Sequence, residues 1–288
     1  MHLMLLPSVI VVLIFSYGPI AGLVMAFQDF QEGKGWFGSP WVGLDNFKFL
    51  LLLPGSLQSL WNTIFISFGK GLFGLITPLV AALLLSELRS VHYKRTLQTI
   101  LYLPHFLSWV ILSGILIDVL SPSSGIVNNV LKLFGIPPIF FLGDVKWFPI
   151  VAVATDIWKE FGFNSVVFLA ALAGIDPTYY DAATVDGAGH FRRLWHITLP
   201  NLSPMLVMLA LLNLGNILNA GFDQIFNLYS PVVYESGDII DTFVYRTGIR
   251  DALYSVAAAG GFFKSVVSLL LLSVSYYLAY RFADYRIF

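Results

Sequence analysis

Charged and amide side chains interrupt two of the apolar stretches of this 288-residue chain, and they are the side chains best able to do chemistry. The stretch 148–173 carries Asp156, Lys159, Glu160 and Asn164. Helix positions three and four apart are neighbours, so we expect Asp156 to meet Lys159 and Glu160 on one face that Asn164 extends. A charge in hydrocarbon is costly and usually faces a cavity or a partner. The cluster is therefore either a salt-bridged brace in a helix bundle or one wall of a polar path.

The second set consists of three asparagines in the apolar stretch after Pro204, namely Asn213, Asn216 and Asn219. Their spacing of three residues predicts a stripe along one face of a helix. Each amide both donates and accepts hydrogen bonds, so such a stripe beside aromatic side chains suits neutral sugar hydroxyls. Hydrogen bonding between neighbouring helices is the alternative role. With cavity lining as the working interpretation, the candidate substrate-path residues are Asp156, Glu160, Asn164, Asn213, Asn216 and Asn219.

The sequence offers no catalytic or metal-binding set. There is no G-x-x-x-x-G-K-[S/T] pattern, because Gly69-Lys70 lacks the upstream glycine and lies in an apolar stretch, so ATP is not expected to bind here. The chain has no cysteine, and its five histidines are scattered. We expect no cofactor on this chain, and lone lysines such as Lys70 and Lys264 should pair or reach the membrane surface. A net charge of −1 argues against nucleic acid as a partner.

Composition indicates the elements that must position these residues. The chain is 57% hydrophobic and only 11% charged, with a mean hydropathy of +0.79, which is too apolar for a soluble domain. A membrane-spanning helix needs about 20 apolar residues. We therefore predict an all-α membrane protein, with residues 1–288 forming a single transmembrane domain in contact with lipid. The six predicted spans are about 3–27, 60–86, 97–120, 148–173, 205–228 and 254–280.

The longest polar interruption, residues 175–204, is predicted to be a hairpin of two short helices on the membrane surface. Asp176 can cap a helix that begins at Pro177, where proline is tolerated. Asp186-Gly187 and Gly189 should end that helix, since glycine serves helix ends and turns. A second short helix is expected from 190 to about 199, with Pro200 and Pro204 marking its end and the return to the membrane.

The distribution of basic residues predicts which side of the membrane holds this hairpin. Six spans place both termini and the connectors 87–96 and 174–201 on one side. That side has seven Lys and Arg residues, and the other side has six in about twice the length. Because cytoplasmic loops are enriched in Lys and Arg, we expect the hairpin to be cytoplasmic.

The segment D-A-A-T-V-D-G-A-G-H-F-R-R-L-W-H-I-T-L-P resembles the EAA loop of binding-protein-dependent ABC importers, which lies between spans four and five of their permeases. Asp181 stands where the family pattern has Glu, which keeps the charge on a shorter side chain. Three further segments are similar to maltose-type sugar permeases, namely W-K-E-F-G-F-N, A-L-A-G-I-D-P and residues 221–248. The segment 221–248 is most similar to the branch of that family for complex oligosaccharides and polysaccharide fragments. The positions that match the EAA pattern are Ala182, Ala183, Asp186, Gly187, Ala188, Ile197, Leu199 and Pro200.

The resemblance implies a type I ABC importer permease in the bacterial cytoplasmic membrane, with the hairpin as a coupling helix. The nine residues from Asp181 to Pro200 named above would contact a dimer of separate ATPase subunits that hold ATP and magnesium. A second, related permease and an extracytoplasmic solute-binding protein would complete the importer. The implied cargo is a carbohydrate, with an oligosaccharide favoured.

Other functions explain less of the sequence. A secondary transporter or channel would leave the EAA pattern without a role. A membrane-embedded enzyme acting on lipid or glycan would need a convergent acid–base or metal set, and only Asp156 and Glu160 are available. Within the importer class, another polar solute such as an amino acid is the alternative cargo.

Overall fold

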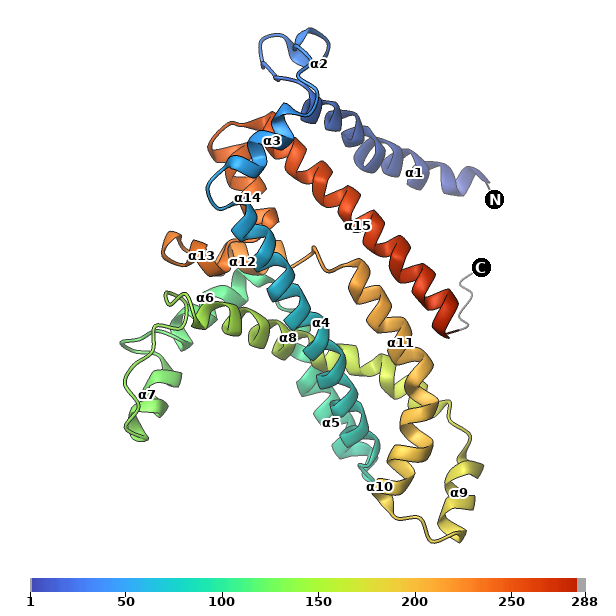
Figure 1. Ribbon diagram of the computed structural model, residues 1–288. Coiled ribbons are helices and arrows are strands. Elements are labelled where there is room, and N and C mark those ends of the chain that lie inside the picture. Colours follow the sequence, from blue (N-terminus) through green and yellow to red (C-terminus); the bar gives the residue numbers. More distant parts are fainter. Residues whose placement is uncertain (1, 284–288) are drawn as a thin grey trace.

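The computed structural model describes residues 2–283, and this part of the chain is built of helices without a β-sheet (Figure 1). The all-α prediction is confirmed. The long helices are α4 (Ser56–Ser86), α8 (Trp147–Ala173), α11 (Leu199–Gly215) and α15 (Tyr254–Ala283). The first span combines α1 (His2–Val12), a π-helical turn η1 (Leu13–Tyr17) and a 3-10 helix η2 (Gly18–Phe27).

Shorter helices connect these elements. Figure 1 places α2 (Gly35–Gly38) and α3 (Asp45–Leu52) at one end of the molecule and α9 (Pro177–Val185) and α10 (His190–Arg193) at the other. The remaining elements are α5 (Val91–Tyr102), η3 (Leu103–Phe106), α6 (Trp109–Val119), α7 (Ile126–Leu133), η4 (Leu194–Thr198), α12 (Phe222–Leu228), η5 (Pro231–Val233), α13 (Tyr234–Gly237), α14 (Ile240–Tyr245) and η6 (Arg246–Arg250).

Helix length and composition allow the predicted six crossings. Four continuous helical segments within the described residues are long and apolar enough to span a membrane, namely Leu5–Phe27, Ser56–Ser86, His190–Gly215 and Tyr254–Leu278. Two bent pairs, α5–η3 with α6 and α8 with α9, bring the number to six if each pair forms one span. Six spans are therefore compatible with the structure, but two of the predicted spans differ from the observed helices in their bounds.

The third predicted span, 97–120, is not one continuous helix. α5 ends at Tyr102, a 3-10 turn holds Pro104, and α6 starts after Ser108 at an angle of 101° to the first arm. Proline cannot donate the hydrogen bond that would continue the α-helix. The Ser108 hydroxyl instead accepts a hydrogen bond from the Ile111 amide at 3.4 Å and caps the second arm.

The fifth span, predicted at 205–228, begins and ends earlier. The helix runs without interruption from His190 through the π-helical turn η4 into α11, so Pro200 and Pro204 do not end it. Pro200 lies in the first turn of α11 directly after the π turn, where a missing amide hydrogen is tolerated. The helix stops at Gly215, and residues 216–221 are not helical.

The packing of α4 against α8 is the most extensive contact between helices, and α11, η2 and α3 all pack on α15. Much of the buried apolar core lies where α4, α6, α8 and α12 meet, and it contains Ile66, Leu112, Phe148, Ile225 and Val233. Many other large apolar side chains remain exposed. An apolar outer surface is what lipid contact requires.

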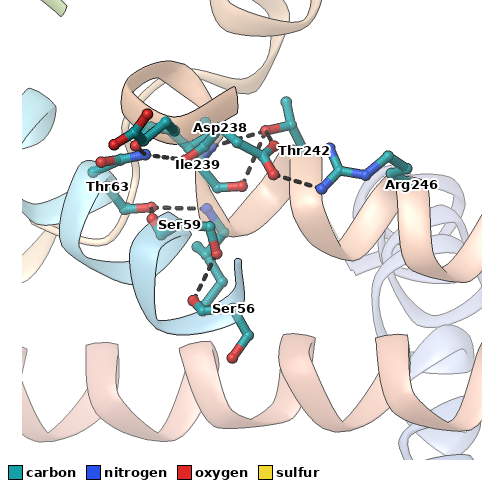
Figure 2. Close-up of polar contacts among 10 residues, drawn as sticks. Ser56, Ser59, Thr63, Asp238, Ile239, Thr242 and Arg246 are labelled. Carbon is teal, nitrogen blue, oxygen red and sulfur yellow. Dashed lines mark hydrogen bonds and ion pairs between the residues drawn. The ribbon is translucent and has the colours of Figure 1, made fainter. Parts of the chain in front are cut away.

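A buried polar network joins α4 to the segment that holds α13 and α14 (Figure 2). The Ile240 amide donates to the Thr63 hydroxyl at 2.8 Å, and Asp238 accepts from Thr242 at 2.8 Å and from Arg246 at 2.6 Å. Because polar groups in a protein interior are stable only when paired, this network fixes the segment 234–246 on the end of α4.

Candidate functional site

All six predicted substrate-path residues line one polar cavity of about 240 Å³. α4 and α8 form two of its walls, and the end of α11 with residues 216–221 forms the third. Gly71 and Gly74 leave room on the α4 side. The sequence prediction therefore named residues that the fold brings together from distant parts of the chain. The polar side chains that line this cavity include Lys70, Asp156, Glu160, Asn164, Asn213, Asn216 and Asn219.

Lys70 holds the cavity walls together. Its ammonium group lies 3.1 Å from the Asp156 carboxylate and donates to the Ala220 carbonyl at 2.8 Å and to the side-chain oxygen of Gln224. Gln224 in turn donates to the Ala152 carbonyl and the Thr155 hydroxyl, both at 2.8 Å. The expectation that Lys70 pairs is confirmed, as is that for Lys264, which donates to the two carboxylate oxygens of Asp241 at 2.5 and 2.7 Å.

The predicted brace within α8 is wrong in its partners. Asp156 pairs with Lys70 on α4 instead of Lys159, while Glu160 accepts from its chain neighbour Lys159 at 2.7 Å. The second oxygen of Glu160 lies 2.6 Å from Nδ1 of His105. Sequence spacing could not show these pairings because two of the partners come from other helices.

The three asparagines reach the cavity by different routes, so the predicted helical stripe is wrong. Asn213 lies on α11, Asn216 caps its end, and Asn219 belongs to the non-helical segment that follows. Asn216 donates to the Leu212 carbonyl at 3.2 Å. The side chains of Asn164, Asn213 and Asn219 make no hydrogen bond within the described residues. These three amides are therefore available to a polar molecule in the cavity.

His105, one of the five scattered histidines, lies beside the cavity through its contact with Glu160. Besides its contact with Glu160, its ring stacks on Phe163 with 4.0 Å between centroids. A histidine directly after a proline inside an apolar stretch was the available signal, but its partner is 55 positions away. In residues 2–283 no group of three or more His, Asp or Glu side chains could hold a metal ion.

The hairpin predicted at 175–204 begins as expected. Asp176 accepts a hydrogen bond from the Thr178 amide at 2.9 Å and caps α9, whose first residue is Pro177. This hydrogen bond lowers the pKa of the Asp176 carboxyl below its ordinary value, so the cap is ionised at neutral pH. The capping contribution is present above the unfolded-state pKa and is lost as the pH falls through the folded-state pKa.

α9 ends in a Schellman motif at Gly187. The Ala188 amide donates to the Ala183 carbonyl at 2.8 Å, and the Gly187 amide donates to the Thr184 carbonyl at 3.1 Å. Gly187 has a φ of +75°, which L side chains rarely adopt. The predicted glycine turn is confirmed, and the sequence A-A-T-V-D-G-A is the one that forms it.

The hairpin presents apolar side chains outward. Asp181, Ala182 and Asp186 are exposed, as is Pro200 after the turn, while Ala183, Ala188, Ile197 and Leu199 are half-buried. Val185 and Phe191 are 89% and 75% exposed, and Trp195 is also exposed. Sequence reasoning did not single out these three side chains. Two contacts hold the arms of the hairpin, Tyr180 hydroxyl to Thr198 hydroxyl at 3.0 Å and Arg193 to the Thr184 hydroxyl at 3.2 Å.

The hairpin also touches the connector after α4. His190 lies 3.7 Å from the Glu87 carboxylate, and a cavity of about 620 Å³ separates the end of α4 from α10 and η4. The two connectors that the sequence placed on one side of the membrane are therefore neighbours in the fold.

An apolar helix bundle with a polar cavity and a surface hairpin of this form is consistent with a membrane permease, and the comparison with known families gives the same class. Residues 70–288 match the family described as "binding-protein-dependent transport system inner membrane component". The chain belongs to this family, and it is an inner-membrane transport permease. The predicted family and location are confirmed.

Relatives cover essentially the whole chain. Protein LplB of Bacillus subtilis (strain 168) is 40% identical over 288 residues, which are 100% of this chain and 91% of LplB. The polygalacturonan/rhamnogalacturonan transport system permease protein YteP of the same organism is 37% identical over 100% of this chain and 90% of YteP.

A solved structure shows the same fold. A chain of a bacterial alginate ABC transporter, crystallised in complex with an alginate pentasaccharide-bound periplasmic protein, aligns with a TM-score of 0.90 at 38% identity. The alignment covers 99% of this chain and 96% of that chain. The predicted type I ABC importer permease architecture is confirmed.

Proposed function

We propose that this chain, as a single permease domain, translocates oligosaccharides across the cytoplasmic membrane as one subunit of an ATP-driven importer. The observation that carries the proposal is the amide-lined cavity. Three amides that make no hydrogen bond within the described residues line this cavity, those of Asn164, Asn213 and Asn219. An amide both donates and accepts hydrogen bonds, and a sugar hydroxyl does the same. The relatives named for polygalacturonan, rhamnogalacturonan and alginate support this class of cargo.

The proposed partners follow from the two ends of the molecule. The hairpin 175–204 would lie in the cytoplasm and dock on one subunit of an ATPase dimer, which holds ATP and magnesium. An extracytoplasmic solute-binding protein would deliver the cargo at the end that carries α2 and α3. A second, related permease would cover the open side of the cavity, since its amides cannot face lipid without a polar partner. In this assignment Asp181, Ala182, Ala183, Asp186, Gly187, Ala188, Ile197, Leu199 and Pro200 form the coupling surface.

A phosphorylated cargo is less consistent with the cavity. A relative from Pectobacterium atrosepticum, 26% identical, is named as an sn-glycerol-3-phosphate transport permease. The cation that lines the cavity in this chain, Lys70, is already bonded to Asp156, Ala220 and Gln224. A phosphate would have to displace these partners.

Uptake measurements with the complete importer in proteoliposomes test the proposal. The probes are an alginate pentasaccharide, an oligogalacturonide, a neutral oligosaccharide and sn-glycerol 3-phosphate. We expect ATP-dependent uptake of at least one oligosaccharide, and a fall of about tenfold in Asn213→Ala, the factor for losing about 1.4 kcal/mol of hydrogen bonding. Asn227→Ala is the matched control, because Asn227 is a half-buried asparagine on α12 that donates to the Asp223 carbonyl and does not line the cavity. Uptake of glycerol phosphate alone would contradict the proposal.

A further inference from the structure

The break in the third span lies against the charged part of α8. α5 and α6 meet at 101° around the turn that holds Pro104 and His105. On α8, Lys159 and Glu160 face this turn. Charges inside a membrane-spanning bundle are rare and mark functional positions. Because Lys159 and Glu160 both lie at this bend, the bend itself is expected to have a functional role.

The two charged side chains hold both arms of the bend. Lys159 donates to the His105 carbonyl at 2.9 Å, and its ammonium lies 5.6 Å from the centre of the Trp109 ring on α6. Glu160 lies 2.6 Å from the His105 ring. The Lys159 side chain is only 8% exposed, so these partners replace its water. The bend is thus fixed by one polar cluster from α8.

The same cluster reaches the polar cavity. One carboxylate oxygen of Glu160 contacts His105 and the other contacts Lys159, and the Glu160 side chain lines the cavity beside Asn164. The orientation of this carboxylate at the cavity wall is therefore set by the residues at the bend.

α5 connects this cluster to the far end of the molecule. The helix has 12 residues, and its capping residue Ser90 follows three positions after Glu87, which contacts His190 of the hairpin. At its other end α5 lies close against α8, since a methyl group at Gly162 would overlap the Leu101 carbonyl. A displacement of the hairpin has a short rigid helix through which to reach the bend.

We propose that His105 is a positioning residue that couples the hairpin to the cavity. It fixes the Glu160 carboxylate at the cavity wall, and movement of α5 changes that orientation through the His105–Glu160 hydrogen bond. This inference rests on the proposed transport function and adds to it a route between the two sites.

The decisive measurement is the number of solute molecules imported per ATP hydrolysed by the complete importer. We expect this ratio to fall about tenfold in His105→Ala, which lies within the range of measured allosteric couplings. His105→Gln should recover most of it, because an amide can still donate to Glu160. His92→Ala, on the exposed surface of α5 and without a side-chain partner within the described residues, should equal the parent protein. If the role of His105 were purely structural, His105→Ala would lower the amount of assembled importer. The importers that do assemble would still import the same number of solute molecules per ATP hydrolysed.

A second readout follows the bend itself. The chain has no cysteine, so spin labels can be attached to two introduced cysteines, Ile100→Cys on α5 and Ile117→Cys on α6. The distance between the two labels reports the angle between the arms. The signal from labelled partner subunits is measured in an importer without these two cysteines and subtracted. We expect a narrow distribution that shifts on ATP binding, and a broad one without a shift in His105→Ala. Unchanged distances and an unchanged ratio in His105→Ala would overturn the inference. If no oligosaccharide is imported but the distances still respond as expected, the cargo assignment fails while the inference stands.

Discussion

Gly187 shows how one residue sets the geometry of the hairpin. Nothing lies within 4 Å of the place where a side chain would begin, so its requirement is conformational and not steric. The φ of +75° suits glycine and, to a lesser degree, asparagine. A β-branched residue in this conformation is a genuine outlier.

We therefore predict different effects for two substitutions at Gly187. Gly187→Val should destabilise the turn by about 1–2 kcal/mol or more and reduce association with the ATPase subunits. Gly187→Asn should keep most of the association. The measurement is co-purification of the ATPase with the permease, normalised to the amount of permease in the membrane. Equal association in the valine variant and the parent protein would show that the turn is not part of the docking surface.

At the scale of elements, α5 lies so close to α8 that the contact leaves no room for a side chain at Gly162. Gly162 on α8 faces the Leu101 carbonyl of α5. Gly114 on α6 has nothing within 4 Å of its missing side chain. These two glycines form a natural pair for testing whether tight packing of α5 matters.

Gly162→Ala should force α5 away from α8 and destabilise the complex by about 1–3 kcal/mol, the usual effect of overpacking. Gly114→Ala should be neutral or slightly stabilising, because alanine favours helix formation over glycine. Thermal unfolding of the purified complex measures both effects. A Gly162→Ala variant as stable as Gly114→Ala would mean that α5 can shift without cost, which would also weaken the proposed route through α5.

Elements with local signals were predictable from the sequence. Asp176, Pro177 and Gly187 are a cap, a first-turn proline and a stop signal, and each acts within a few residues of itself. Long apolar runs likewise located α4 and α15. An apolar run hides the proline turn after Tyr102. The three-residue spacing of Asn213, Asn216 and Asn219 continues past Gly215, although the helix ends there.

The sequence predicted which residues line the cavity, but it did not predict which side chains contact one another there. Polar residues in apolar stretches identified Asp156 and Glu160 as cavity candidates. Their partners Lys70 and His105 lie 86 and 55 positions away, and only the packing of α4, η3 and α8 brings them close. Side-chain spacing within one helix carries no information about such contacts.

For the whole molecule, the arrangement predicts opposite accessibility at its two ends. The chain has no cysteine, so single cysteines report location without background from this subunit. In intact cells a membrane-impermeant maleimide should label Phe37→Cys on α2, whose side chain is fully exposed. It should label Arg193→Cys on the hairpin only after permeabilisation. The reverse pattern would invert the proposed topology.

The η2 part of the first span and the residues that follow it pack on α15, which has a consequence for synthesis of the chain. The Phe30 amide donates to the Ser255 hydroxyl at 2.9 Å across 225 positions, and the Phe27 ring lies 5.4 Å from that of Phe262. At about 5–20 residues per second, the ribosome needs roughly 10–45 s to make the intervening chain. During that interval the first span resides in the bilayer without its partner helix. A nascent chain that stops before α15 therefore exposes an incomplete bundle, which is the form that membrane quality-control proteases would encounter.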